Sequence, residues 1–301
     1  FKCTGSEEHV KSTEISDIQN QNSENDIYSS IGLSYIEPEL RENNGEIEAS
    51  KNNQLPILIK NSDIKGIIHT HSTYSDGANS IEEMACECIE QGYEYLGITD
   101  HSKSAFYAGG LTDEEIVEQH NEITELNKKY APFKIFHGIE SDILKNGLLD
   151  YPDEILSIFD FVIASVHSVF NLPENEMTKR IIKAIRNPYT TILGHPTGRL
   201  LLGREAYNVN MDEILNECVK TNTVIEINAN PHRLDLDWKY HKKAKEMGVL
   251  FAINPDAHSS KNINHVKYGV ITARKGWLEK TDIINSFNVK EITNFFNDRH
   301  P

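Results

Sequence analysis

The sequence is short of cysteine, of positive charge and of long apolar runs. Only four of its 301 residues are cysteine, and no two of them form a CxxC pair. A disulfide framework is therefore not expected, and the chain suits a reducing cytoplasm. No apolar run approaches the roughly 20 residues that cross a bilayer. We accordingly expect a cytoplasmic protein without a membrane partner.

Positive charge is scarce, because 30 Lys+Arg stand against 46 Asp+Glu, a formal net charge of −16 at pH 7. This balance excludes a module that coats nucleic acid through bulk charge. If the protein handles phosphate, the phosphate charge must be neutralised locally, by a few arginines or by metal ions. Hydrophobic residues still make up 38% of the chain, enough to bury a full core.

The chain divides into two parts that differ in composition. Residues 1–63 are polar and weakly periodic, and 10–30 is predicted to be a linker or disordered. Order is expected to return near Pro38, which can occupy the first turn of a short helix. The apolar run 55–59 either forms a strand or lies against the second part of the chain. Because the chain begins with Phe1 rather than Met, we interpret it as a fragment that lacks an upstream segment.

In residues 64–301, short β-rich runs alternate with segments that carry helix signals. The runs are 65–71, 93–101, 133–140, 159–167, 190–196, 222–230 and 249–258. Ser80 with Glu83 and Thr112 with Glu115 have the spacing of a capping box, which predicts the start of two helices. Seven β-then-α units in a row predict parallel strands with right-handed crossovers. We therefore expect an α/β fold, a distorted (β/α)7 barrel of the TIM type.

Six of the 13 histidines fall at the carboxyl end of a predicted strand, where barrel enzymes assemble their active sites. They are His69, His71, His101, His167, His195 and His258. Glu140 and Asp256 end strands in the same way, and Asp76 lies in the loop after the first strand. The H-x-H and D-x-H spacings place two side chains on one face of a strand. Imidazole and carboxylate ligands without thiolate suit Zn, Mn or Fe, so these residues predict a polynuclear metal site.

Cationic and aromatic residues near the same strand ends are candidates for substrate contacts. Arg199 and Arg233 follow rim strands, and arginines so placed can clamp a phosphate bidentately, although a surface ion pair is the alternative interpretation. His232, in NANPHRLDL, is a candidate substrate contact, whereas the remaining histidines are interpreted as structural. Further candidates are Arg204 and Lys103 for phosphate, and Tyr74 and Tyr107 for stacking on a base.

The motifs around these residues resemble the PHP (polymerase and histidinol phosphatase) domain. In order they are HTHSTYSDG (69–77), ITDHS (98–102), GIESDI (138–143), SVHS (165–168), GHPTGRLL (194–201), NANPHRLDL (228–236) and DAHS (256–259). More narrowly, they resemble the form fused to the C-terminus of bacterial family X DNA polymerases, over about residues 64–285. FKCTGSEEH (1–9) and IGLSYIEPELRENNGEIEA (31–49) are similar to the segments that precede this domain in that family. Residues 1–63 are thus interpreted as a remnant of the polymerase thumb and linker, and residues 64–301 as the barrel.

The resemblance implies a trinuclear site with three divalent ions, Mn²⁺ or Zn²⁺, with Fe as an alternative. The family pattern assigns His69, His71 and Asp256 to one ion, Glu140 to a bridge, His167 and His195 to the second ion, and Asp76, His101 and His258 to the third. Water activated between such ions attacks phosphorus. The catalytic set that the resemblance implies is Glu140, Asp256, Arg199 and Arg233.

Three hypotheses about function remain open. The first is a nuclease of DNA repair that removes nucleotides from DNA 3′ ends with Mn²⁺ preferred, with 3′-phosphatase and abasic-site cleavage as related activities that the family implies. The second is a small-molecule phosphatase of the histidinol-phosphate type. The third is a non-catalytic scaffold, which missing ligands would favour, and none is missing. The polymerase-like segments favour the first, with an upstream polymerase core as partner; polymerisation itself is not expected, since its paired carboxylates would precede Phe1.

Overall fold

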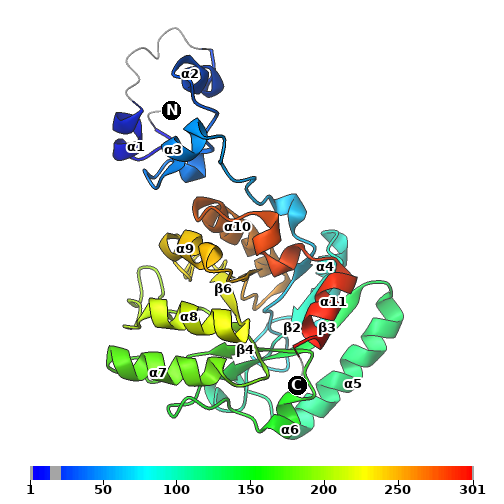
Figure 1. Cartoon of the computed structure of the whole chain (residues 1–301). Helices are drawn as coiled ribbons and strands as arrows, with labels where there is room; N and C mark the ends of the chain where they lie inside the picture. The colour runs from blue at the N-terminus through cyan, green and yellow to red at the C-terminus, as the bar shows by residue number, and fades with distance from the viewer. Residues whose placement is uncertain (1–2, 14–21, 300–301) are drawn as a thin grey trace.

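A computed structural model describes residues 3–13 and 22–299 and shows a small helical unit beside a barrel (Figure 1). The strands are β1 (Gly66–Ile67), β2 (Tyr95–Ile98), β3 (Lys134–Asp142), β4 (Phe161–Ser165), β5 (Thr190–Leu193), β6 (Val224–Asn228) and β7 (Phe251–Asn254). Each strand pairs in parallel with the next one along the chain. The predicted distorted barrel of seven β/α units is confirmed.

An α-helix follows each strand, as the β/α alternation of the sequence predicts. The helices are α1 (Glu7–Ser12), α2 (Glu24–Ser30), α3 (Glu46–Lys51), α4 (Ile81–Glu90), α5 (Asp113–Tyr130), α6 (Asp153–Leu156), α7 (Glu174–Ile185), α8 (Met211–Thr221), α9 (His241–Glu246), α10 (Val266–Lys275) and α11 (Val289–Asn297). The last strand, β7, is followed by both α10 and α11. The capping box predicted at Ser80 and Glu83 begins α4, where each residue's side chain accepts from the other's backbone N–H. Among the described residues, no helix is both long and apolar enough to cross a membrane.

The barrel is nearly closed, and a buried amide joins its two edge strands. Asn285 donates through Nδ2 to the carbonyl oxygen of Gly66 in β1 at 3.2 Å, and its Oδ1 accepts from the backbone N–H of Ile253 in β7 at 2.8 Å. Beyond the strand ends, Thr70 and Ala257 form a parallel bridge. The segments that follow β1 and β7 therefore meet at the rim where the candidate site residues lie.

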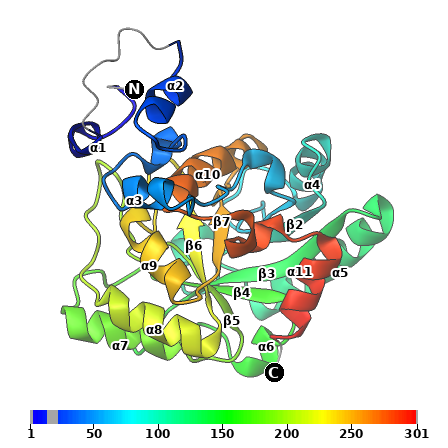
Figure 2. The same ribbon diagram turned by 45° about the horizontal axis from the view of Figure 1, so that its top comes forward.

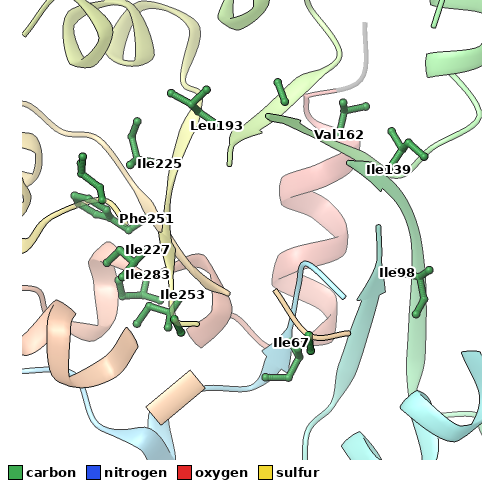
Figure 3. Packing of buried hydrophobic residues seen from close by; sticks show 14 of the residues in the cluster. Ile67, Ile98, Ile139, Val162, Leu193, Ile225, Ile227, Phe251, Ile253 and Ile283 are labelled. Carbon is green, nitrogen blue, oxygen red and sulfur yellow. The ribbon is translucent and has the colours of Figure 1, made fainter. Parts of the chain in front are cut away.

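Alternation along the strands sorts the core into two layers, and Figure 3 shows residues of the outer one. Ile98, Ile139 and Val162 point outward and belong to the cluster that packs under the surrounding helices. Phe161 points into the barrel interior with the other inward residues. A Cβ on Gly97 would lie 2.8 Å from the Phe161 ring, so glycine is required beside it. The interior below the rim is thus filled by side chains rather than open.

The prediction that 10–30 is a linker or disordered is wrong where the structure describes it, because α1 and α2 are helical; residues 14–21 lie outside the described residues. The side chains of Ser6 and Ser23 cap the two helices. Buried polar contacts replace the missing apolar periodicity: His9 contacts Glu46 at 2.5 Å and Tyr28 at 2.8 Å. Polar contacts therefore stabilise this unit together with an apolar cluster that includes Ile36 and Leu40.

The N-terminal unit, residues 3–13 and 22–58, lies against α10 and α9 (Figure 2), and Lys242 on α9 donates to the carbonyl oxygen of Asn44 at 2.7 Å. Arg274 on α10 pairs with Glu39 at 2.6 Å, and Lys275 pairs with Glu42 at 2.6 Å. Trp277 packs with the unit's apolar residues. The sequence left open whether 55–59 forms a strand or lies against the second part of the chain. It lies against the second part, since its only strand-like pairing among the described residues is an isolated bridge between Leu58 and Glu279.

Candidate metal centre

The structure brings all nine predicted metal-site residues to the carboxyl ends of the barrel strands. They follow β1 (His69, His71, Asp76), β2 (His101), β4 (His167), β5 (His195) and β7 (Asp256, His258), or lie in β3 (Glu140). All but Asp76, His167 and His258 are almost completely buried. Residues far apart in the sequence thus form one contiguous cluster of imidazoles and carboxylates.

Glu140 lies at the middle of this cluster. Its two oxygens are near five imidazole nitrogens: His195 Nε2 at 2.9 Å, His101 Nδ1 at 3.1 Å, His167 Nε2 at 3.2 Å, His69 Nε2 at 3.3 Å and His71 Nε2 at 3.7 Å. Strand alternation directs Glu140 into the barrel above the glycine at position 138, two residues earlier on the same face. Glu140 therefore lies near more imidazoles of the cluster than either Asp76 or Asp256 does.

The other two acidic residues lie near overlapping sets of imidazoles, since His71 and His258 each approach both carboxylates. Asp256 Oδ1 lies 3.2 Å from His71 Nε2 and 3.6 Å from His69 Nε2. Asp76 Oδ1 lies 3.3 Å from His258 Nε2 and 3.6 Å from His101 Nε2. The geometry of the side chains therefore defines an Asp256 group and an Asp76 group that share imidazoles.

Three sets of ligand atoms lie within 4.8 Å of one another and fit a metal ion. They are His71, Asp76, His101 and His258; His69, His71 and Asp256; and His101, Glu140 and His167. The set around Asp76 and the set around Asp256 contain the residues that the family pattern assigns to them. The difference is that His71 belongs to both sets. The third has His101 where the family pattern places His195, whose Nε2 contacts Glu140 instead. Each set could hold an ion, and neighbouring sets share His71 or His101.

Buried polar atoms without a hydrogen bond support the fit to metal ions. They are His69 Nε2, His71 Nδ1 and Nε2, His101 Nδ1, His195 Nδ1 and Glu140 Oε2. Burying such groups unpaired costs free energy, so native proteins rarely do it without a reason. Carboxylate oxygens lie near most of these nitrogens, but without hydrogen-bond geometry. This arrangement, with only nitrogen and oxygen donors, is expected where a divalent ion lies between the ligands.

Three of the nine residues adopt a backbone conformation that non-glycine residues rarely adopt. The φ angles are +66° at His69, +22° at His195 and +51° at Asp256. The sequence argument for H-x-H assumed a strand, but β1 ends at Ile67, so turns direct His69 and His71 to one site. Left-handed backbone costs a non-glycine residue about 1–2 kcal/mol. Strain of this kind persists where the surrounding structure enforces it, and it clusters at functional sites.

Two carboxylates that the sequence analysis missed contact the Nδ1 atoms of ligand candidates, on the side of the ring away from Glu140. Glu226 contacts His69 Nδ1 at 2.5 Å and accepts from the backbone N–H of His195 at 2.7 Å. Asp142 contacts His167 Nδ1 at 2.5 Å. Such carboxylate–histidine pairs fix the orientation of a ligating ring and raise its basicity. The available signal was alternation, since Asp142 shares a strand face with Glu140 and Glu226 is the one charged residue within β6.

A further buried carboxylate, Asp100, holds the loop that carries Asp76. Asp100 Oδ1 accepts from the backbone N–H of Ser72 at 2.7 Å, and Oδ2 accepts from Gln119 Nε2 at 2.7 Å. The hydroxyl of Ser75 also donates to Asp100, at 2.5 Å. The position of Asp76 is therefore set by the packed interior and not by solvent-exposed chain.

Electrostatics differ from one ligand of the centre to the next. Burial disfavours the charged form of His69, His167 and His258, but neighbouring carboxylates outweigh it. They raise the pKa of His69 well above its usual range, that of His167 to about 10 and that of His258 to about 9, so a metal ion must displace protons there.

Burial alone would raise the pKa of Glu140, but the imidazoles of His167, His69 and His101 outweigh it and hold that pKa well below its usual range. Burial, with the neighbouring His101 and His258 rings, lowers the pKa of His71 to about 4. Glu140 is therefore anionic and His71 neutral at pH 7, as ligands must be.

The two candidate arginines occupy different places. Arg233 Nε lies 3.3 Å from Asp256 Oδ2, and its Nη1 is buried without a hydrogen-bond partner. Arg199 is committed to the loop around Arg233: its Nη1 pairs with Asp237 at 2.6 Å, and its Nε donates to the carbonyl oxygen of Arg233 at 3.0 Å. Arg233 therefore contacts the centre directly, whereas Arg199 braces the loop that carries it.

The remaining candidates lie around the rim. Arg204 donates to the carbonyl oxygen of Gly198, and its guanidinium lies 3.9 Å from the centre of the Phe170 ring. The Lys103 ammonium lies over the Tyr151 ring at 5.0 Å, and Tyr74 donates to Glu122 at 2.9 Å. His232 is exposed, and Tyr107 is 65% exposed. Tyr74 is also packed against the core. Tyr107 is thus the tyrosine of the pair whose ring is open to solvent.

Comparisons with known proteins agree on the family. Residues 68–230 match the family model of the PHP domain. The chain is 44% identical, over 96% of its own length, to the DNA polymerase/3′-5′ exonuclease PolX of Bacillus subtilis (strain 168), and it spans 50% of that protein. It is 30% identical to a probable phosphatase of Thermoanaerobacter sp. (strain X514), over 77% of this chain and 94% of that protein.

A solved structure supports the fold. It is the histidinol phosphate phosphatase of Lactococcus lactis subsp. lactis Il1403, complexed with zinc, L-histidinol and phosphate. The match covers 68% of this chain and 92% of that protein, with a TM-score of 0.51 and 21% sequence identity. At this identity the likeness establishes a shared barrel fold, and the site must be argued from the residues of this chain.

Proposed function

Since this chain belongs to the PHP domain family, we propose that it is a metal-dependent 3′–5′ exonuclease that shortens DNA from its 3′ end in DNA repair. The family and the site together support the coarser assignment, a metal-dependent phosphoesterase. The observation that carries the proposal is the set of five imidazoles around Glu140, with buried nitrogens that lack hydrogen bonds. The relative with both polymerase and exonuclease activities in its name supports DNA as substrate.

The proposed ligands are the nine predicted residues, grouped around Asp256, Glu140 and Asp76. Divalent ions held there, Mn²⁺ or Zn²⁺ with Fe as an alternative, would acidify water toward neutral pH and offset the negative charge on a phosphodiester. Glu226 and Asp142 keep the rings of His69 and His167 turned toward the centre. The barrel interior beneath excludes solvent from the buried side of the site.

Arg233 is the proposed phosphate contact. Its guanidinium is held near Asp256, so a phosphate at the centre would meet a fixed positive charge with a free donor at Nη1. Arg199 is proposed to act through Arg233, because it binds the backbone carbonyl of that residue and not the centre. The chain has a net charge of −16, so its overall charge does not attract a phosphate. A single arginine placed at the centre supplies that attraction locally.

The domain assignment is part of the same proposal. Residues 64–301 form the phosphoesterase barrel, and residues 1–63 are the end of a polymerase thumb and linker whose upstream core is the partner in a longer protein. Similarity to a polymerase over 96% of this chain supports this assignment. A small-molecule phosphatase is the second candidate, because a probable phosphatase is matched over 94% of its length.

The experiment that tests the proposal compares the wild type with Arg233→Ala on two substrates. With Mn²⁺, the wild type is expected to shorten a 5′-labelled single-stranded oligonucleotide stepwise from its 3′ end. Arg233→Ala is expected to lower that rate about 10- to 100-fold, because a charge-assisted hydrogen bond contributes about 1.5–3 kcal/mol. Metal content measured by mass spectrometry should stay unchanged.

Arg186→Ala is the matched control, since this exposed arginine pairs with Glu217 on the helical side of the barrel and should leave digestion unchanged. Hydrolysis of p-nitrophenyl phosphate without any shortening of DNA would establish the phosphatase instead. Loss of metal from Arg233→Ala would assign that arginine a structural role.

A further inference from the structure

Two aromatic side chains project into solvent from one short turn beside the metal centre. The turn is the 3-10 helix η3 (Phe106–Ala108), on which Phe106 is 84% and Tyr107 65% exposed. Their rings lie 5.9 Å apart, edge to face. Single exposed apolar residues are common, but two adjacent exposed aromatic rings make a patch that calls for a ligand or partner.

The turn that carries these rings is firmly held. Ala105 and Ala108 are buried, and the backbone N–H of Ala105 donates to the carbonyl oxygen of Ser102 at 2.9 Å. Gly109, at φ +68°, ends the turn in a conformation that glycine adopts without strain. The backbone N–H of Gly110 returns to the carbonyl oxygen of Ala105 at 3.2 Å. The exposure of the rings is therefore fixed by packing beneath them and not by a loose loop.

The same turn lies directly against the candidate ligands. The chain that leaves it donates from Leu111 to the carbonyl oxygen of His101, at 2.9 Å. On the other side, a Cβ built on Gly109 would lie 3.6 Å from the carbonyl oxygen of Ser75, the residue before Asp76. The turn thus packs between the segments that carry two of the proposed ligands.

Electrostatics agree with this position. Burial, followed by the carboxylates of Asp142, Glu140 and Asp76, raises the pKa of Tyr107 to about 12. The positive charge of the Arg233 guanidinium has the opposite effect and lowers the pKa of this phenol. Charged groups of the centre therefore lie close enough to act on Tyr107, in agreement with the packing of its turn beside them.

We propose that Phe106 and Tyr107 form a stacking platform for the unpaired bases at the 3′ end of single-stranded DNA. This inference rests on the proposed exonuclease function. When the terminal phosphodiester reaches the metal centre and Arg233, the attached bases must pass over the rim, where they have lost the stacking of a duplex. An aromatic face stabilises any base without regard to sequence, as an exonuclease requires. Since the chain is acidic overall, stacking supplies affinity that backbone attraction does not.

The test replaces both rings, as Phe106→Ala with Tyr107→Ala, and measures KM and kcat on a single-stranded oligonucleotide. Stacking contributes about 1–3 kcal/mol per base, so KM is expected to rise about 10-fold or more. Metal content should not change, because it does not depend on a base. Tyr107→Phe keeps the ring and should retain the wild-type KM.

A binding measurement separates this inference from catalysis. In the presence of a chelator, fluorescence anisotropy should show that a labelled oligothymidylate binds the wild type more tightly than the double variant, and that an abasic oligonucleotide binds both alike. Ile57→Ala, at an 81% exposed apolar residue before β1, is the matched control and should bind like the wild type. If the wild type shortens DNA but the double variant keeps its KM and affinity, the stacking platform is overturned while the exonuclease stands. If the wild type does not shorten DNA at all, the proposed function fails.

Discussion

Replacing Asp256 with asparagine is expected to abolish DNA digestion. The loss should exceed the roughly 10- to 100-fold decrease that follows when a residue that only orients a metal ligand is removed. The Asp256 carboxylate contacts His71 and Arg233 and forms one of the three candidate ligand sets with His69 and His71. Asparagine is the informative replacement, because it nearly matches the shape of aspartate and tolerates the φ of +51° that the position requires. The charge and a ligand oxygen are lost while the backbone is kept.

The measurement is the rate of 3′-end digestion together with metal content per chain. Asp212→Asn is the matched control, because this carboxylate lies on α8 and pairs with Lys243 at the surface. It should change neither quantity. An Asp256→Asn protein that digests DNA at the wild-type rate with its full metal content would remove Asp256 from the centre.

Replacing Glu226 with glutamine is expected to lower metal affinity about 10- to 100-fold, the effect typical of a residue that orients a ligand. Four donors converge on the two Glu226 oxygens, from His69, from the backbone of His195, and from the amides of Asn228 and Asn254. A glutamine side chain presents an amide N–H where an oxygen now accepts, so at least one buried donor loses its partner. That loss costs about 1–3 kcal/mol of folding stability as well.

Rescue by metal distinguishes a positioning role from a structural one. Excess Mn²⁺ should restore much of the activity of Glu226→Gln, because the ligands themselves remain. Glu213→Gln, an exposed residue in the first turn of α8, is the control and should match the wild type at every Mn²⁺ concentration. Full metal affinity in Glu226→Gln, measured by competition with a chelating dye, would show that Glu226 does not position His69 or His195.

The barrel could be predicted because its signals are local. The capping boxes at Ser80 and Thr112 each begin a helix at the expected residue, and short apolar runs between such helices leave few alternatives to parallel strands. The ends of β1 and β7 could not be placed, because tight turns at His69 and Asp256 replace the last strand residues. Positive φ at a histidine or an aspartate leaves no signature in a single sequence.

Eight of the nine predicted ligands could be singled out because they fall at predicted strand ends, and Asp76 lies in the loop after the first strand. Their supporting carboxylates have only the weaker signal of strand alternation. Glu226 lies within a strand among isoleucine and valine, where a charge is unexpected until its partners are known. Similarly, α1 and α2 are stabilised by His9, Glu46 and other polar residues that meet only in the folded chain. In both cases the deciding interactions are non-local.

The central claim is that these residues hold a polynuclear metal centre that cleaves DNA. The most direct measurement strips the protein with a chelator, returns Mn²⁺ stepwise, and records both bound metal and 3′-end digestion. Digestion is predicted to disappear on stripping and to return as binding approaches three ions per chain, in keeping with the three adjoining ligand sets. Undiminished digestion by protein that mass spectrometry shows to be free of metal would contradict the claim.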